Sequence, residues 1–179
     1  ERKWLTKKDC DKVDFGSMDQ YIDYEKIYKG RFKLLRKAYE KSNIAENEDF
    51  QAFCEEEKDW LPDYCLYMAI KDENGGKSFI EWPEKLRKRD KKEIAVAKRR
   101  LASEIEFYAF LQYMFTLQWL SIKDYANEKG IEIIGDIPIY VAYDSADTWA
   151  RPELFLLDEE GYPTGVAGCP PDYFSKTGQ

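Results

Sequence analysis

The chain has 179 residues, a net charge of −7 and no histidine. This length suffices for a domain with its own core, and a content of 44% hydrophobic and 16% aromatic residues excludes a disordered chain. The acidic balance argues against a nucleic-acid-binding protein, whose contact surface is normally basic. Without histidine the chain can form no Ser-His or Cys-His dyad, so acid–base chemistry within it must use carboxylates, tyrosine or lysine.

The first predicted element is a short helix, for which Thr6 and Asp9 have the spacing of a capping box. Ser17 is a candidate cap for the next helix, in which apolar residues recur at helical spacing as far as Tyr39. The N-terminal region is therefore predicted to be mostly helical.

Two more helices are expected before residue 75. One is amphipathic and covers about residues 49–61, and Pro62 can begin the other. The loop that follows, at 72–76, superficially resembles a calcium-binding loop. The required sixth-position glycine is Lys77, however, and we expect no bound metal.

The longest regular pattern runs from about Lys92 to Lys129 and predicts one long helix, which Gly130 ends as a C-cap. Its apolar stripe has helical spacing and flanking aromatic residues, so we expect this helix to be covered on more than one side. The stripe consists of Ile105, Tyr108, Leu111, Phe115, Trp119, Ile122 and Ala126.

An aliphatic run at 131–134 is interpreted as a strand buried on both faces. Pro138 cannot donate to a ladder, so the strand should finish near Asp136. A helix followed by a strand of the parallel type suits an α/β barrel. Since one strand cannot close a barrel, the sequence predicts a piece of such a fold.

After this strand, one helical turn is expected at 145–149, capped by Asp144 or Ser145, with Asp144 otherwise a turn residue. The runs 154–157 and 164–166 then flank a glycine-containing turn, which predicts a hairpin-like excursion.

Two features point to chemistry. Asp136 follows the predicted strand, and in a parallel barrel the carboxyl ends of strands build the active site. Tyr173 and Phe174 form an aromatic pair on a loop stiffened by Pro170 and Pro171, and aromatic rings offer sugars a flat apolar face. The alternative for Asp136 is a turn residue without a chemical role, and the alternative for Tyr173 and Phe174 is a packing role in the core.

At these residues the chain resembles the 4-alpha-glucanotransferases called amylomaltases or disproportionating enzymes, glycoside hydrolase family 77. The resemblance lies in Gly135–Ala142, in Asp144–Ala150 and in the loop Pro170–Gln179. The sequence ends at Gln179, inside this third motif. The resemblance extends over essentially the whole chain and is weakest in the region up to Lys77.

The resemblance implies an α/β fold, a fragment of a (β/α)8 TIM-type barrel with a largely helical inserted subdomain. Residues 1–90 would form that subdomain, and residues 91–179 would supply a barrel helix, one strand and the active-site loop. Asp136 would support the reacting centre without being the nucleophile. The substrate-binding residues implied in the loop are Tyr173, Phe174, Gln179, Asp172 and Ser175.

The function implied is retaining transfer of α-1,4-glucan segments between malto-oligosaccharides through a covalent glycosyl-enzyme, without a cofactor or metal. The nucleophile and the acid/base carboxylate would lie beyond this chain, so the rest of the barrel is needed and the fragment alone is expected to be inactive. The alternatives are a related α-glucan hydrolase and a non-catalytic structural or sugar-binding module.

We expect a cytoplasmic protein with neither nucleic-acid nor membrane partners. The four cysteines form no C-x-x-C pair, which favours reduced thiols. The sequence shows no run of ~20 apolar residues and no signal peptide, although it does not begin with methionine. Donor length preference and oligomeric state cannot be read from the sequence.

Overall fold

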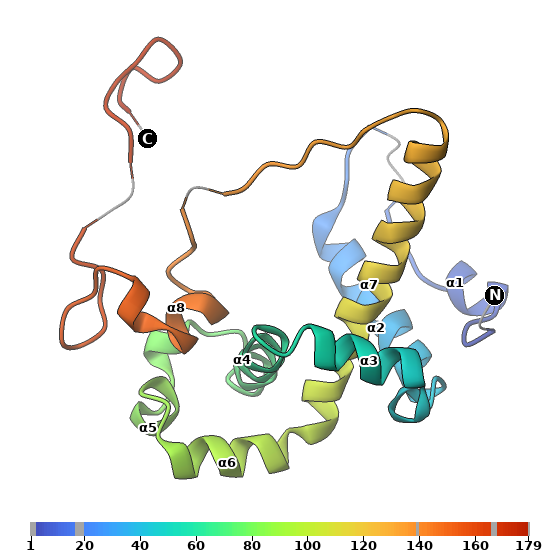
Figure 1. Ribbon diagram of the computed structural model, residues 1–179, viewed down its shortest axis with the longest axis horizontal. Coiled ribbons are helices and arrows are strands. Elements are labelled where there is room, and N and C mark those ends of the chain that lie inside the picture. Colours follow the sequence, from blue (N-terminus) through green and yellow to red (C-terminus); the bar gives the residue numbers. More distant parts are fainter. Residues whose placement is uncertain (1–2, 17–19, 139, 166–167, 179) are drawn as a thin grey trace. The chain divides into compact units, whose positions relative to one another are not determined.

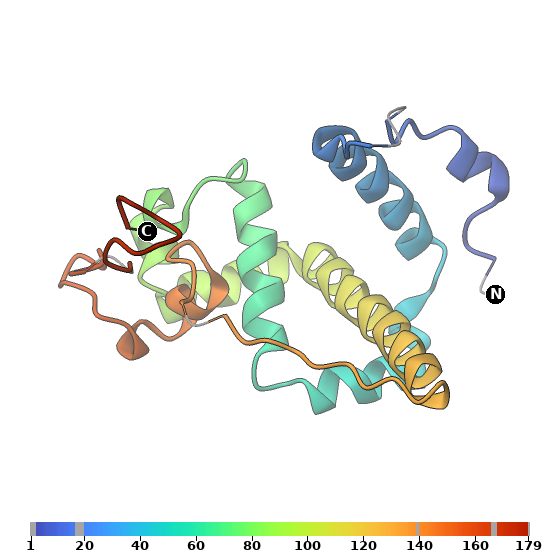
Figure 2. The same ribbon diagram turned by 90° about the horizontal axis from the view of Figure 1, so that it is seen from above.

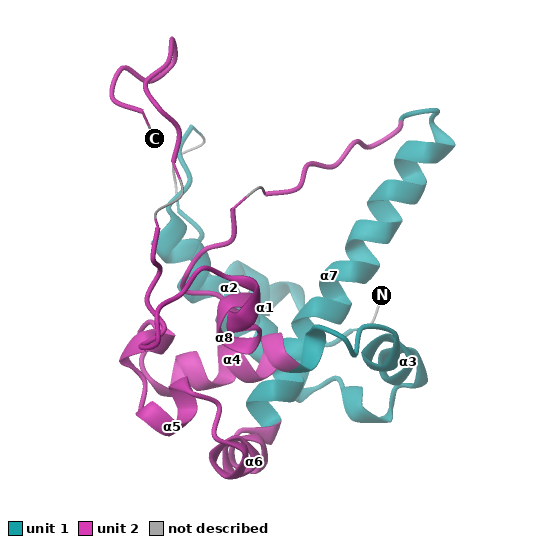
Figure 3. Ribbon diagram, turned by 60° about the vertical axis from the view of Figure 1, so that its left-hand side comes forward, with its two compact units in different colours: residues 1–62, 103–131 teal, residues 63–102, 132–179 magenta. Residues whose placement is uncertain are grey.

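The computed structural model of this chain describes residues 3–16, 20–138, 140–165 and 168–178 (Figure 1). These residues are predominantly helical, as predicted, and within them no β-strand forms. The contacts divide the chain into two compact units, coloured separately in Figure 3. Unit 1 comprises residues 1–62 and 103–131, and unit 2 comprises residues 63–102 and 132–179. The predicted boundary near residue 90 separates an inserted subdomain from a barrel, and the division of this chain into two units is not a test of it.

Most of the helices follow one another with short connections, but residues 129–145 separate the helix that ends at Glu128 from the one that begins at Ala146. In chain order they are α1 (Lys7–Asp11), α2 (Tyr24–Glu40), the 3-10 helix η1 (Ile44–Glu46), α3 (Glu48–Glu56), α4 (Leu61–Glu73), η2 (Phe79–Glu81), α5 (Glu84–Arg87), α6 (Lys91–Arg100), α7 (Ala102–Glu128), α8 (Ala146–Ala150) and η3 (Pro152–Leu154).

Side-chain caps fix where the first helices of unit 1 begin. The capping box at α1 is confirmed, because the Thr6 hydroxyl accepts from the Asp9 amide at 3.2 Å and the Asp9 carboxylate accepts from the Thr6 amide at 3.0 Å. Asp23 caps α2 by accepting from the Lys26 amide at 3.0 Å. The predicted cap Ser17 lies outside the described residues.

Aromatic rings from three helices form the core of unit 1 around α7, the long yellow helix of Figure 2. Phe107 on α7 contacts Phe32 and Tyr39 of α2, with ring centroids 6.5 and 5.4 Å apart. Tyr113, further along α7, contacts Phe50 of α3 at 5.6 Å. Such tilted and edge-on pairs are the arrangements that aromatic quadrupoles favour.

The predicted continuous helix over 92–129 is wrong at one point, because the chain leaves the helix at Leu101 and forms α6 and α7 instead. The two sides of Leu101 have partners in different units. Arg100 makes two hydrogen bonds, of 2.8 and 2.7 Å, to Glu73 in unit 2. Glu104 pairs with α2 in unit 1. Since apolar periodicity continues across the break, the sequence pattern did not reveal it.

Burial along α7 differs between its two halves. Residues 107–110 are consecutive and all buried, so the first half is covered on more than one side, as predicted. In the second half the predicted stripe is exposed in this chain, at 63% for Phe115 and 58% for Ile122. Among the described residues, no helix is long and apolar enough to cross a membrane.

The core of unit 2 contains a cluster of three aromatic side chains. Tyr67, Trp82 and Trp149 contact one another, with ring centroids 5.2 to 5.8 Å apart. The Trp149 indole donates to the Leu86 carbonyl at 3.0 Å, which satisfies its buried N–H. Ser145, one of the two predicted caps, is the N-cap of α8.

The predicted strand at 131–134 is not formed, and residues 131–138 have no regular secondary structure. Ile134 and Ile137 are 92% and 84% exposed in this extended segment. A strand exists only when neighbouring strands pair with its backbone, and the described residues supply no such neighbour. The predicted hairpin does form, as an antiparallel bridge between Leu157 and Pro163.

Candidate functional site

The predicted site residues lie in two separate segments of unit 2. Asp136 lies in the extended segment after α7, and its side chain is exposed and makes no hydrogen bond or ion pair with any described residue. Asp172, Tyr173, Phe174 and Ser175 lie together in the loop at 169–178, while Gln179 is outside the described residues. The structure therefore brings together the loop residues and leaves Asp136 apart from any described partner.

Asp172 holds the loop in a tight turn. One of its carboxylate oxygens, Oδ1, accepts from the backbone amides of Phe174 and Ser175 at 2.9 and 2.7 Å. Its own amide donates to the Ser175 carbonyl at 2.9 Å. Such local side-chain bonds give a short turn a defined conformation. Asp172 thus organises the loop backbone, which the sequence pattern did not indicate.

The loop also closes on itself at Gly178. The Ser175 hydroxyl donates to the Gly178 carbonyl at 2.6 Å, and the Gly178 amide donates to the Ser175 carbonyl at 3.2 Å. Gly178 has a φ of +77°, and a side-chain carbon placed there would collide with the carbonyl oxygen of Cys169. Glycine is therefore required here for both its conformation and its size.

The closed loop presents two aromatic rings to solvent. Tyr173 is 94% exposed and Phe174 is 90% exposed, so neither is a core residue of this chain. Their ring centroids are 5.5 Å apart and their planes are nearly perpendicular, at 89°. Two large exposed rings on one preformed loop make a surface suited to the apolar faces of a ligand.

Asp144 is the residue whose importance sequence reasoning missed. It was predicted to be a cap or a turn residue, but its Oδ1 accepts from the Tyr67 hydroxyl at 2.5 Å and from the Phe79 amide at 3.1 Å. Its Oδ2 forms an ion pair with Lys71. Because these partners are 65 to 77 residues away in sequence, no local pattern signals the contact.

These contacts shift the titration of the groups involved. Burial, together with the bond to the negatively charged Asp144, raises the pKa of Tyr67 well above its ordinary value. Burial by itself would raise the pKa of Asp144 as well, but the hydrogen bonds from Lys71, Tyr67 and the Phe79 amide outweigh it and lower that pKa. Asp144 is therefore held as a carboxylate.

We expect Asp144 to stabilise unit 2 in a pH-dependent way. Its folded-state pKa lies below the unfolded value of about 3.9, so its contribution is fully present above that value and is lost as pH falls through the folded pKa. The measurement is urea unfolding of the 179-residue chain and of its Asp144→Asn variant between pH 7 and pH 2. The difference between their midpoints should shrink on acidification, and a difference that stays constant over this range would contradict the assignment.

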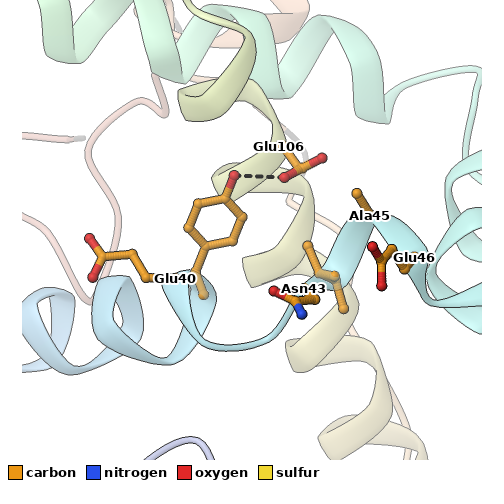
Figure 4. Close-up of a pocket in the computed structure, with 7 residues that line it drawn as sticks. Glu40, Asn43, Ala45, Glu46 and Glu106 are labelled. Carbon is orange, nitrogen blue, oxygen red and sulfur yellow. Dashed lines mark hydrogen bonds between the residues drawn. The ribbon is translucent and has the colours of Figure 1, made fainter.

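Other hollows lie away from the predicted residues. One in unit 1, of about 350 Å³, is lined by Tyr39, Asn43 and three glutamates, and its tyrosine hydroxyl donates to Glu106 at 2.7 Å (Figure 4). A larger one in unit 2, of about 690 Å³, is lined mainly by apolar residues including Leu154 and Leu156. Neither contains a predicted site residue. Within the described part of the chain, no group of histidine, cysteine, aspartate and glutamate side chains is placed to hold a metal ion.

Comparisons of the sequence and of the structure with known proteins give matches that cover almost the whole of this chain. The profile of glycoside hydrolase family 77, described as 4-alpha-glucanotransferase, matches residues 1–179. The 4-alpha-glucanotransferase of Clostridium butyricum is 45% identical over 100% of this chain and 37% of its own length. That of Thermus thermophilus is 51% identical over 93% of this chain and 34% of its own length.

A solved structure shows the same agreement. The amylomaltase from Streptococcus agalactiae in complex with acarbose matches with a TM-score of 0.90 and 37% identity, covering 98% of this chain and 36% of the amylomaltase. This chain thus spans about a third of the length of these relatives. The family match over all 179 residues and the identities above 30% show that the chain belongs to the 4-alpha-glucanotransferase family, glycoside hydrolase family 77.

Proposed function

We propose that this chain is part of an enzyme that transfers α-1,4-glucan segments between malto-oligosaccharides, with the donor segment held covalently on a carboxylate. The observation that carries the proposal is the family match over the whole chain. The acarbose complex of a related amylomaltase supports an oligosaccharide substrate. We place the enzyme in the cytoplasm, with neither cofactor nor metal.

In the proposed full-length enzyme, residues 1–90 form a helical inserted subdomain and residues 91–179 form part of a TIM-type barrel. The exposed isoleucines of the segment after α7 support this arrangement. Ile134 and Ile137 are more than four-fifths exposed here, and they would be covered if the segment became an inner barrel strand. Such a strand would end near Asp136, at the face where barrel enzymes carry their active sites.

The proposed chemistry needs more carboxylates than Asp136. A retaining mechanism uses a nucleophile and an acid/base residue whose carboxyl groups are about 5–5.5 Å apart. We propose that both lie in the part of the enzyme outside residues 1–179. Asp136, whose carboxylate has no partner among the described residues, would then be free to hold a cationic side chain or sugar hydroxyls beside the nucleophile.

The loop residues are proposed to bind the sugar. Tyr173 and Phe174 would stack against it, Gln179 would contact it after cleavage, and the closed loop would hold the rings in place before substrate arrives. Asp172 uses Oδ1 for the loop backbone, and its Oδ2 accepts no hydrogen bond among the described residues. That oxygen, and the lone pairs of the Ser175 hydroxyl, remain available for sugar hydroxyls.

The test is a change in the balance between transfer and hydrolysis. In the full-length enzyme, Tyr173→Ala and Phe174→Ala should each lower transfer more than hydrolysis. A held acceptor loses its positioning when a ring is removed, whereas water is always abundant. The measurement is the ratio of oligosaccharide redistribution to reducing-end release from maltotetraose. Tyr28→Ala, which removes an exposed tyrosine from α2, is the matched control and should leave the ratio unchanged.

Two results would speak against this assignment. If both rates fall by the same factor, the loop binds donor and acceptor alike or supports the fold only. If the unaltered enzyme releases glucose without redistributing chain lengths, it is a hydrolase rather than a transferase.

A further inference from the structure

One carboxylate in unit 2 gathers donors from two other elements. Tyr67 and Lys71 lie one turn apart on α4, and both reach Asp144, while the Phe79 amide at the start of η2 reaches the same carboxylate. We call these four groups the Asp144 anchor. Its ionic pair is largely covered, with side-chain exposures of 22% for Lys71 and 34% for Asp144. A half-buried carboxylate with three donors fixes the chain at one point, because moving it would leave charged groups unpaired.

The residues next to Asp144 are held as well. The Thr148 hydroxyl donates to the Ala142 carbonyl at 3.3 Å, and the Tyr143 hydroxyl donates to the Gly161 carbonyl at 2.6 Å. By contrast, residues 132–138, all of them described, make no hydrogen bonds in this structure. The chain is therefore held at Ala142, Tyr143 and Asp144, whereas residues 132–138, which include Asp136, have no such bonds.

From these contacts we infer that the Asp144 anchor is a positioning device for Asp136, an inference that rests on the proposed function. Asp136 and Ala142 are six positions apart in the sequence, a reach of about 20 Å in an extended chain. Once neighbouring strands pair with the segment, a slip of one residue would turn every side chain to the opposite face. A fixed point downstream selects one register, and that register determines whether Asp136 faces the reacting sugar.

The polar character of the anchor supports this role over a purely stabilising one. Well-packed apolar residues often stabilise a fold as much as a covered ion pair does, whereas a polar set accepts only one arrangement. In Tyr67 the packing and the polar contact use different parts of the side chain: the ring packs against Trp82 and Trp149, and the hydroxyl donates to Asp144. Tyr67→Phe therefore removes one of the three bonds to Asp144 and retains the packing of the ring.

The experiment is a double-mutant cycle in the full-length enzyme, with maltotriose as substrate. Tyr67→Phe should lower kcat about tenfold with little change in KM, since small displacements at a reacting centre are costly. In an Asp136→Asn background the same change should have almost no further effect, because residues that act through one another are not additive. Ile70→Val, a buried substitution on the same helix, is the control for lost stability and should leave kcat unchanged.

A second readout does not depend on activity. Hydrogen exchange at residues 132–142 of the full-length protein should be faster in Tyr67→Phe than in the unaltered protein, and unchanged in Ile70→Val. Unchanged exchange in Tyr67→Phe would overturn the inference, as would an equal loss of kcat in both backgrounds. A full-length protein that redistributes no glucan would instead refute the proposed function, while the exchange measurement would still decide whether the anchor fixes this segment.

Discussion

Asp136→Asn in the full-length enzyme is expected to lower kcat by about 10²–10³-fold while leaving folding largely unaffected. Removing one preorganised electrostatic partner of a reacting centre typically costs about 3–4 kcal/mol in the transition state. Folding should be spared because the Asp136 carboxylate is exposed and has no hydrogen-bond partner among the described residues. The change from carboxylate to amide is nearly isosteric, so the effect isolates the charge.

The measurement is the initial rate of maltotriose disproportionation at saturating substrate, with thermal unfolding to confirm the fold. Asp147→Asn provides the matched control, since Asp147 is an exposed aspartate in the first turn of α8 and is assigned no role in the reaction. Its kcat should stay within about twofold of the unaltered enzyme, as surface substitutions usually do. Near-normal turnover of Asp136→Asn would return Asp136 to the status of a turn residue.

The 179-residue chain by itself is expected to have no transglycosylase activity. The reaction requires two carboxyl groups about 5–5.5 Å apart across the scissile bond, and we place both outside residues 1–179. The segment that bears Asp136 also lacks the strand partners that would present it to a sugar. Loss of both the reacting groups and their positioning leaves no route to catalysis.

This prediction is tested by incubating the purified chain with maltotriose and resolving the products by chain length. The full-length enzyme at the same concentration serves as the positive control. A preparation of an unrelated protein from the same host strain reports contaminating host enzyme. Redistribution by the chain above that background would show that the essential carboxylates lie within residues 1–179.

The features that were predicted correctly from the sequence are mostly those formed by residues close together in the chain. Thr6 and Asp9 form their capping box, Ser145 caps α8, and the hairpin closes between Leu157 and Pro163. These features depend on residues a few positions apart, whose hydrogen bonds are specified by local spacing. The family resemblance likewise rested on short contiguous motifs, and the comparisons confirm the family.

Tertiary structure decided the features that depend on distant partners. The break at Leu101 separates Arg100, which pairs within unit 2, from Glu104, which pairs within unit 1, and the three donors on Asp144 come from residues 65 to 77 positions away. The run at 131–134 has a strand-like sequence but forms no strand, because pairing is supplied by neighbours and not by the run itself. Sequence by itself therefore determined the caps, turns and apolar character of each segment. Only the folded chain decided which segments pair, because hydrogen bonds and ion pairs between distant residues have no local signature.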